Sequence, residues 1–112
     1  MQDDVDPFDT YAPVASWSSI CMLMVTALQQ GWITKQIDFS NAFVQAPMER
    51  DVYIALPHMF HDSSNLPLRD LCLHLKKSLY GLKEAPKLWA DWLAKGLKLA
   101  GFEPSDHAPG IF

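Results

Sequence analysis

The sequence is poor in cysteine, has no long apolar run and carries no excess of positive charge. Its two cysteines, Cys21 and Cys72, are too few for a disulfide scaffold or a four-cysteine zinc site. No apolar run approaches the roughly 18 to 20 residues that cross a bilayer, so we expect no membrane partner and an intracellular location, either cytoplasmic or nuclear. Nine basic against thirteen acidic residues give a net charge of -4, which argues against a surface that is basic throughout.

What is present is typical of one globular domain. The chain has 112 residues, of which 49% are hydrophobic and 20% charged, and these values are close to the average for domains of this size. A complete polymerase, kinase or synthetase would need a longer chain. No internal repeat and no low-complexity segment is visible, so we expect a folded domain rather than a disordered chain.

The charged residues are unevenly distributed along the chain. Residues 1–34 contain four acidic residues and no basic one, and we expect the acidic segment 1–10 to be poorly ordered. Residues 76–98 contain six lysines and two acidic residues, a local net charge of +4. This second stretch is either a solvated helix surface or a basic face that binds a partner.

The first helix is predicted over residues 16–30. Apolar residues in it follow the spacing of one buried helical stripe, and they are Ile20, Leu23, Met24, Ala27 and Leu28. Ser16 or Ser18 can accept hydrogen bonds from the first-turn amides, and Gly31 is a typical helix stop. Both ends of this helix are therefore specified by local residues.

Three short strands and a second helix are predicted in the rest of the chain. The strands cover residues 32–39, 52–56 and 71–75, with a surface loop at 59–67. After a turn at Tyr80 and Gly81, the second helix opens at Ala85 and Pro86 and ends at Gly101. We expect its core face to consist of Trp89, Trp92, Leu93, Gly96, Leu97 and Ala100.

The order of these elements predicts an α+β structure with short antiparallel strands packed against two main helices. The last two residues, Ile111 and Phe112, look like the start of a further strand. A strand that begins there without a partner would leave an exposed edge. We therefore interpret the chain as one partial domain.

Asp38 is the most informative single residue, because it is an acid at the end of an apolar strand. Between Ile37 and Phe39 it must be exposed by a turn, paired, or bound to a cation such as magnesium. The alternative is an Asx-type turn or helix cap formed with Ser40 and Asn41.

A zinc site is a weaker possibility. Its conceivable ligands are His58, His61, Cys72 and His74, with Cys21 and His107 in addition. Their spacings are not those of a zinc finger, and the first two fall in a predicted loop while Cys72 falls in an apolar strand. We do not expect zinc binding.

Several ordered motifs together point to one family. These are the runs QIDFSNAF at residues 36–43 and KKSLYGLKEAPKLW at residues 76–89, with supporting stretches at 11–14, 51–57 and 101–112. From about residue 8 to the end, the sequence resembles the reverse transcriptases of copia-type retrotransposons. The resemblance implies a partial right-hand polymerase fold, in which residues 1–112 supply part of the fingers and the first half of the palm.

The resemblance also implies site residues. Asp38 matches the catalytic, metal-binding aspartate of the first palm motif, which helps hold two Mg²⁺ ions in the family. Phe39, Phe43, Tyr80 and Gly81 match nucleotide-binding positions, although Phe43 is otherwise a core residue and Tyr80 a half-exposed turn residue. Two further lysines, Lys83 and Lys87, match positions that touch template phosphates, or else they are simply solvated.

The sequence departs from the family pattern in ways that bear on activity. The Tyr-x-Asp-Asp motif is not found, and Asp106 precedes the hairpin expected to carry it. Cys21 stands where many relatives have arginine, and Glu84 where glutamine is common, so Glu84 adds negative charge beside the presumed nucleotide site. We expect the isolated chain to be inactive as an RNA-directed DNA polymerase.

Three hypotheses follow for partners. In a complete enzyme the partners are the RNA template, the DNA primer, the deoxynucleotide and the remainder of the polyprotein. The alternative is a non-catalytic retrotransposon remnant that uses the basic helix from Lys83 to Lys98 to bind RNA or a polymerase fragment. The third is a small α+β domain whose exposed edge binds a partner protein.

Overall fold

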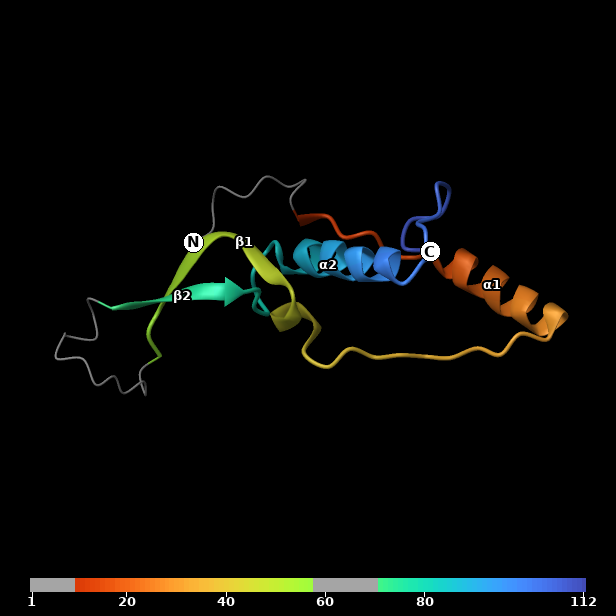
Figure 1. The fold of residues 1–112 in the computed structure, drawn as a ribbon, viewed down its shortest axis with the longest axis horizontal. Helices are drawn as coiled ribbons and strands as arrows, with labels where there is room; N and C mark the ends of the chain where they lie inside the picture. The colour runs from red at the N-terminus through yellow and green to blue at the C-terminus, as the bar shows by residue number, and fades with distance from the viewer. Residues whose placement is uncertain (1–9, 58–70) are drawn as a thin grey trace.

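The structure is a computed structural model of the chain, and it describes residues 10–57 and 71–112. Within these residues the order of elements is helix α1 (Trp17–Gln30), 3₁₀ helix η2 (Ala42–Gln45), strand β1 (Pro47–Ala55), strand β2 (Cys72–Lys77) and helix α2 (Ala85–Leu99). Figure 1 shows α1 at one end, the two strands at the other and α2 between them. The expected α+β composition with antiparallel strands is confirmed.

Helix α1 begins and ends where its local residues predict. The Ser16 side chain accepts a hydrogen bond from the Ser19 amide at 3.1 Å, which satisfies one of the free first-turn donors. At the other end Gly31 adopts a left-handed conformation with φ of 67°, and the Trp32 amide donates to the Ala27 carbonyl at 2.8 Å. This is the hydrogen-bond pattern of a glycine-terminated helix.

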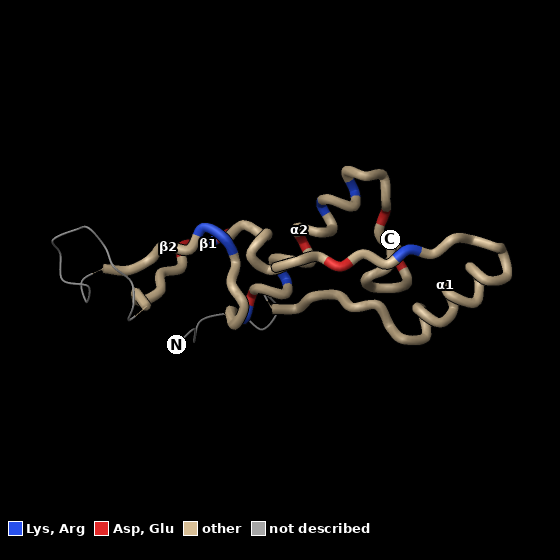
Figure 2. Tube along the Cα trace, turned by 90° about the horizontal axis from the view of Figure 1, so that it is seen from below, with Lys and Arg blue, Asp and Glu red and all other residues tan. Residues whose placement is uncertain are grey.

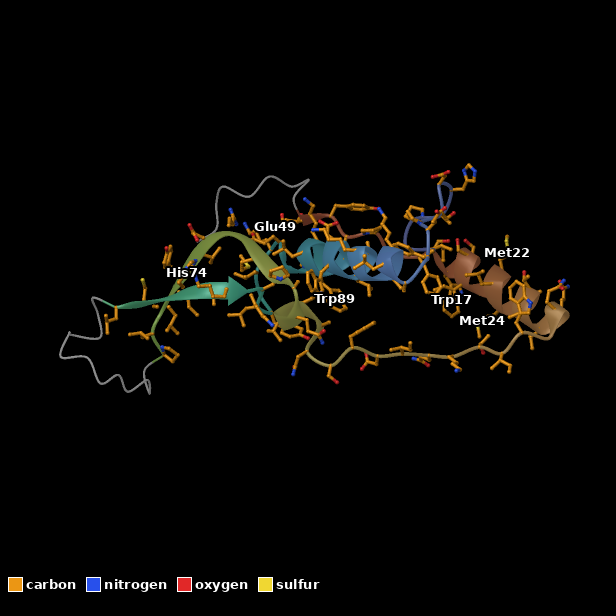
Figure 3. All side chains as sticks on the ribbon, in the orientation of Figure 1. Trp17, Met22, Met24, Glu49, His74 and Trp89 are labelled. Atoms are coloured by element: carbon orange, nitrogen blue, oxygen red, sulfur yellow. The ribbon has the colours of Figure 1, made fainter. Side chains whose placement is uncertain are left out.

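The prediction that α1 buries an apolar stripe is wrong. Ala27 is its only buried residue, whereas Leu28 is 83% exposed. Figure 3 shows Met22 and Met24 on different sides of the helix, neither covered by another element. The physical reason is that α1 has no extensive contact with any other helix or strand of the described part. Periodicity predicted the helix correctly, but no other helix or strand of residues 10–57 and 71–112 covers its apolar side.

The predicted strand at residues 32–39 is also not formed. The segment runs extended from α1 back along the molecule to η2 (Figure 1), and every residue of it is exposed. No strand of the described residues pairs with it. Its apolar residues Ile33 and Ile37 are largely exposed, and Phe39 is 43% exposed.

Strands β1 and β2 form an antiparallel pair with a break in register. Val52 pairs with Leu75 and Ala55 with Cys72, but Pro47 pairs with Lys77. Residues 48–51 of β1 therefore stand opposite Lys76 alone, as a wide bulge. The predicted strands at 52–56 and 71–75 are confirmed in their shared parts, and the alternating burial of Val52 to Leu56 is as expected.

Helix α2 begins at Ala85 with Pro86 in its first turn, as predicted. Its predicted core face is only partly covered, because Trp89, Leu93 and Leu97 are half-buried while Trp92 is 45% exposed. Leu88, which is buried, was not among the predicted core residues. The chain leaves the helix through Gly101 and the Phe102 amide donates to the Leu97 carbonyl at 3.0 Å. Residues 111–112 form no strand within the described residues, so that expectation is wrong too.

The buried centre lies where η2, β2 and α2 meet, and small side chains occupy it. Ala46, Ser78 and Ala85 have no exposed surface, and Leu88 and Glu84 are also buried. The Ser78 amide donates to the Ala46 carbonyl at 2.9 Å and joins two segments that are distant in sequence. The Ser78 Oγ has no hydrogen-bond partner among the described residues.

The molecule is elongated, with extents of 66 × 28 × 24 Å. Its radius of gyration is 19.3 Å, whereas a compact chain of this length has a value of about 13 Å. In the described residues no helix has the length and apolarity needed to span a membrane. The expected loop at 59–67, nearly all of the acidic segment 1–10, and His58 and His61 lie outside the described residues.

Replacing Ser78 with alanine is expected to stabilise the fold. A buried hydroxyl without a partner costs about 1 to 3 kcal/mol, and Ser78→Ala removes it without changing the shape of the site, so we expect the free energy of unfolding to rise by about 1 kcal/mol. Urea unfolding monitored by circular dichroism measures this change. Ser40→Ala, the same substitution at an exposed position, should change the value by less than about 0.5 kcal/mol. A clear loss of stability in Ser78→Ala would show that the Ser78 hydroxyl does form a stabilising hydrogen bond, and would contradict this prediction.

Candidate functional site

The predicted nucleotide-binding residues are brought together by two aromatic contacts. The rings of Phe43 in η2 and Tyr80 in the turn before α2 have centroids 4.7 Å apart, tilted by 41°. Phe39 and Trp89 of α2 meet edge to face at 5.2 Å, an arrangement that aromatic pairs favour. Figure 3 shows Trp89 on the side of α2 that faces the extended segment. Residues from the two family motifs therefore meet in space.

Asp38 directly precedes Phe39 in the extended segment between α1 and η2. Its side chain is exposed, and no described residue hydrogen-bonds or ion-pairs with it. Within the described residues Asp38 forms no Asx-type turn or helix cap with Ser40 and Asn41, so that alternative is wrong. Asn41 is the residue before η2, with a left-handed φ of 52°, and its side chain makes no capping bond. The Asp38 carboxylate is thus open to an incoming ligand.

The turn at Tyr80 and Gly81 requires glycine for its backbone rather than for space. Gly81 has φ of 96°, a conformation that L side chains rarely adopt. A Cβ at this position would meet nothing within 4 Å. The backbone of the turn is therefore accessible, as the predicted nucleotide contact needs.

Glu84 was expected to add negative charge beside this site, but the charge is paired. The Arg50 Nε donates to the Glu84 Oε1 at 2.9 Å, and the Arg50 Nη2 donates to Oε2 at 2.6 Å. The Glu84 side chain is 9% exposed and the Arg50 side chain 47%. Sequence reasoning missed this pair because Arg50 lies in the bulge of β1, whose register the sequence does not reveal.

The predicted template-contacting lysines lie at the start of α2. Lys83 is exposed and Lys87 is half-buried, and both have interactions with neighbouring residues. Figure 2 shows basic residues on the β1 and α2 parts of the molecule and no charged residue on α1. The six lysines of residues 76–98 thus lie in β2, in the turn before α2 and along α2, whereas Arg50 in β1 stands between Glu49 and Asp51.

A second polar cluster on the sheet was not predicted. The His74 Nε2 lies 2.8 Å from the Asp51 Oδ1, and the Lys76 Nζ lies 2.8 Å from the His74 Nδ1. The Tyr53 ring stacks on His74 at 4.7 Å, because these two residues are paired across the strands. Only the strand register could have revealed this cluster, in which His74 contacts an acid and a base rather than cysteines.

The described residues do not assemble a complete metal centre. No group of three or more histidine, cysteine, aspartate or glutamate side chains is placed to hold an ion within residues 10–57 and 71–112. Asp38 offers the oxygen ligand that Mg²⁺ prefers. A single carboxylate does not make the two-ion site that the motif implies.

Comparison with known proteins identifies similar sequences. A family model described as "Reverse transcriptase (RNA-dependent DNA polymerase)" matches residues 2–112. The chain is 32% identical over 108 residues to the Retrovirus-related Pol polyprotein from transposon RE2 of Arabidopsis thaliana, and 33% identical over 108 residues to that from transposon RE1. Over 106 residues it is 31% identical to the Transposon Ty1-ER2 Gag-Pol polyprotein of Saccharomyces cerevisiae.

The matches cover most of this chain and little of each relative. They include 96% of the chain for the two Arabidopsis proteins and 89% for the yeast protein. The chain spans 7% of the length of the first two and 6% of the third. No solved structure matches the chain.

Two glycine substitutions should have opposite effects on stability. Gly81→Ala forces a side chain into a left-handed conformation and is expected to lower the free energy of unfolding by about 1 to 2 kcal/mol. Gly96→Ala lies within α2, where a Cβ meets nothing within 4 Å, and should raise it by about 0.5 to 1 kcal/mol because alanine favours the helix. Thermal unfolding of both variants tests whether Gly81 has a left-handed conformation in the turn. Equal effects of the two substitutions on stability would contradict that conformation.

Proposed function

Because the chain belongs to the reverse transcriptase (RNA-dependent DNA polymerase) family, we propose that it forms part of the fingers and the first half of the palm of a copia-type polymerase. One observation carries the proposal. Phe43 and Tyr80, which are 37 positions apart and match two separate nucleotide-binding motifs, are in ring contact. The Asp38 carboxylate, from the same segment as Phe43, is exposed and open to a ligand.

Each residue has a role in this proposal. Asp38 supplies one carboxylate to bound Mg²⁺, which when present neutralises charge on the nucleotide triphosphate and activates the primer hydroxyl. Phe39 and Phe43 line the nucleotide pocket from the first motif, with Phe43 restricting the space beside the sugar. Tyr80 and Gly81 contribute from the second motif, where the glycine lets the backbone approach the base or template closely.

The remaining metal carboxylates are proposed to come from polypeptide outside this sequence. The Tyr-x-Asp-Asp motif that supplies them in the family is not among these residues. One carboxylate cannot hold two ions in the geometry that phosphoryl transfer requires. On this basis the isolated chain binds parts of the substrate but does not extend a primer.

The exposed apolar surface supports the idea that further polypeptide covers this chain. The accessible surface is 9432 Å², whereas a compact monomer of this mass exposes about 6,200 Å². The excess of about 3,200 Å² on this chain alone is more than the roughly 800 Å² per partner of a standard-sized interface. Leu28, Ile33 and Ile37, in α1 and residues 32–39, are among the largely exposed apolar residues. We propose that the rest of a Pol polyprotein buries this surface.

Transplanting the chain tests the polymerase role. The matching segment of a copia-type reverse transcriptase with measured primer-extension activity is replaced by residues 2–112 of this chain. We expect the chimera to incorporate deoxynucleotides in a template-dependent reaction, and Asp38→Ala to reduce the rate at least about 1,000-fold, because metal-dependent charge stabilisation is lost. Asp91→Ala, an exposed acid on α2, should leave the rate unchanged.

Two outcomes would overturn the proposal. One is a well-folded chimera, with a melting temperature close to that of its parent, that incorporates no nucleotide. The other is primer extension by the isolated 112-residue chain that is lost in Asp38→Ala, since this would show that the chain needs no further carboxylate.

The second candidate function is RNA binding by the start of α2. It is favoured by the basic positions there, Lys83 and Lys87, which follow Lys76 and Lys77 at the end of β2 in the sequence. A backbone-binding surface of this kind weakens with increasing salt because counterions are released.

Charge reversal distinguishes this function from nonspecific attraction. Lys83→Glu with Lys87→Glu should weaken binding to single-stranded RNA at least about tenfold at low salt, as loss of two phosphate contacts predicts. Lys95→Glu with Lys98→Glu alters the net charge equally at the other end of α2 and should have a smaller effect. Fluorescence anisotropy at several salt concentrations measures both. Equal weakening by the two pairs would argue against a site at the start of the helix.

A further inference from the structure

Two segments of the chain meet at three successive points. Residues 43–50 contribute one partner to each contact and residues 78–84 contribute the other. The contacts are the backbone bond of Ala46 with Ser78, the ring contact of Phe43 with Tyr80, and the ion pair of Arg50 with Glu84. Tyr80 therefore lies between the backbone bond of Ser78 and the ion pair of Glu84 in the second segment, while Phe43 precedes Ala46 and Arg50 in the first.

The bulge of β1 is what brings Arg50 to the start of α2. If the register of Val52 with Leu75 continued, Asp51 would pair with Lys76 and Arg50 with Lys77, but here Lys77 pairs with Pro47 instead. Bulges redirect side chains away from the regular strand pattern. Arg50 thereby reaches across to Glu84, which lies 34 positions further along the chain.

The geometry of the pair suits positioning. Two parallel N–H to oxygen bonds, at 2.9 and 2.6 Å, fix the relative orientation of the guanidinium and the carboxylate as well as their separation. Glu84 makes no side-chain capping bond to α2. Removal of Arg50 would take both of these bonds from a carboxylate whose side chain is only 9% exposed, which disfavours the observed conformation.

Glu84 is connected to Tyr80 by a short stretch with little freedom. The Leu82 amide donates to the Leu79 carbonyl at 3.3 Å, and the Ala85 amide donates to the Leu82 carbonyl at 3.2 Å. These consecutive turns couple the position of Glu84 to that of the Tyr80 ring. A displacement at Glu84 is therefore passed to the aromatic contact.

We propose that the Arg50–Glu84 ion pair is a positioning device that holds Tyr80 against Phe43 and so sets the geometry of the nucleotide pocket. The proposal rests on the proposed polymerase function for its consequence, but its structural part concerns this chain alone. It also explains how a negative charge is accommodated beside the pocket, since Arg50 neutralises Glu84 where the charge would otherwise oppose a triphosphate.

Nuclear magnetic resonance of the 112-residue chain tests the structural part. With labelled phenylalanine and tyrosine, the wild type should show nuclear Overhauser effects between the Phe43 and Tyr80 rings, whose centroids are 4.7 Å apart. Arg50→Gln should abolish them. The charge-swapped double variant Arg50→Glu with Glu84→Arg should restore them, because the pair is re-formed with its charges exchanged. Asp51→Asn, in the same bulge but paired with His74, should leave them unchanged.

The ring contact in these variants decides whether the Arg50–Glu84 pair holds Tyr80 against Phe43. Loss in Arg50→Gln with recovery in the charge-swapped variant supports the proposal, including the case in which Arg50→Gln unfolds and the swap restores both fold and ring contact. Retention of the ring contact in Arg50→Gln overturns it. So does a charge-swapped variant that folds, by circular dichroism, without the ring contact.

The functional part is read separately in the chimeric polymerase. There Arg50→Gln should raise the KM for deoxynucleotide about five- to tenfold with a smaller change in kcat, and the charge-swapped variant should reverse the increase. A general loss of stability would instead reduce the amount of active enzyme and leave KM unaltered. If the chimera is inactive while the ring contact in the isolated chain depends on Arg50, the proposed function fails and the structural role of the pair stands.

Discussion

The hydrogen bond from the Ser78 amide to the Ala46 carbonyl holds together the two parts of the chain that carry the candidate site. It can form because Ala46, Ser78 and Ala85 are small, so that the backbones of η2, β2 and α2 come close. Larger side chains at these positions would separate the segments and with them the aromatic residues. The Ser78 hydroxyl is buried without a partner in the same place, which suggests that its size matters more than its polarity.

The fold was predictable where local residues determine it. Ser16 and Gly31 bound α1, and Pro86 and Gly101 bound α2, because caps and backbone preferences act within a few residues. Burial was not predictable in the same way. The apolar periodicity of α1 indicates that one side favours an apolar environment, but it does not say which part of the polypeptide supplies that environment.

The candidate site shows the same division. Asp38, Phe43 and Tyr80 were singled out from motifs, and the ring contact between the last two is seen in the structure. The pairing of Glu84 with Arg50 was missed because it depends on the bulge between Pro47 and Val52. A strand prediction gives the length of the strand and the alternation of its side chains. A bulge depends on which residues of the two strands are hydrogen-bonded to each other, and the sequence of one strand does not determine that pairing.

The sequence separation of the ion pair has a consequence for the order in which the protein is made. A ribosome adds about 5 to 20 residues per second, so the 34 positions between Arg50 and Glu84 correspond to a delay of roughly 2 to 7 seconds. During this interval α1 can already form, since its caps lie within residues 16–31. The aromatic site cannot assemble until the second motif has emerged. Translation speed through the connecting segment therefore sets how long Phe43 and Arg50 exist without Tyr80 and Glu84, their partners in the complete chain.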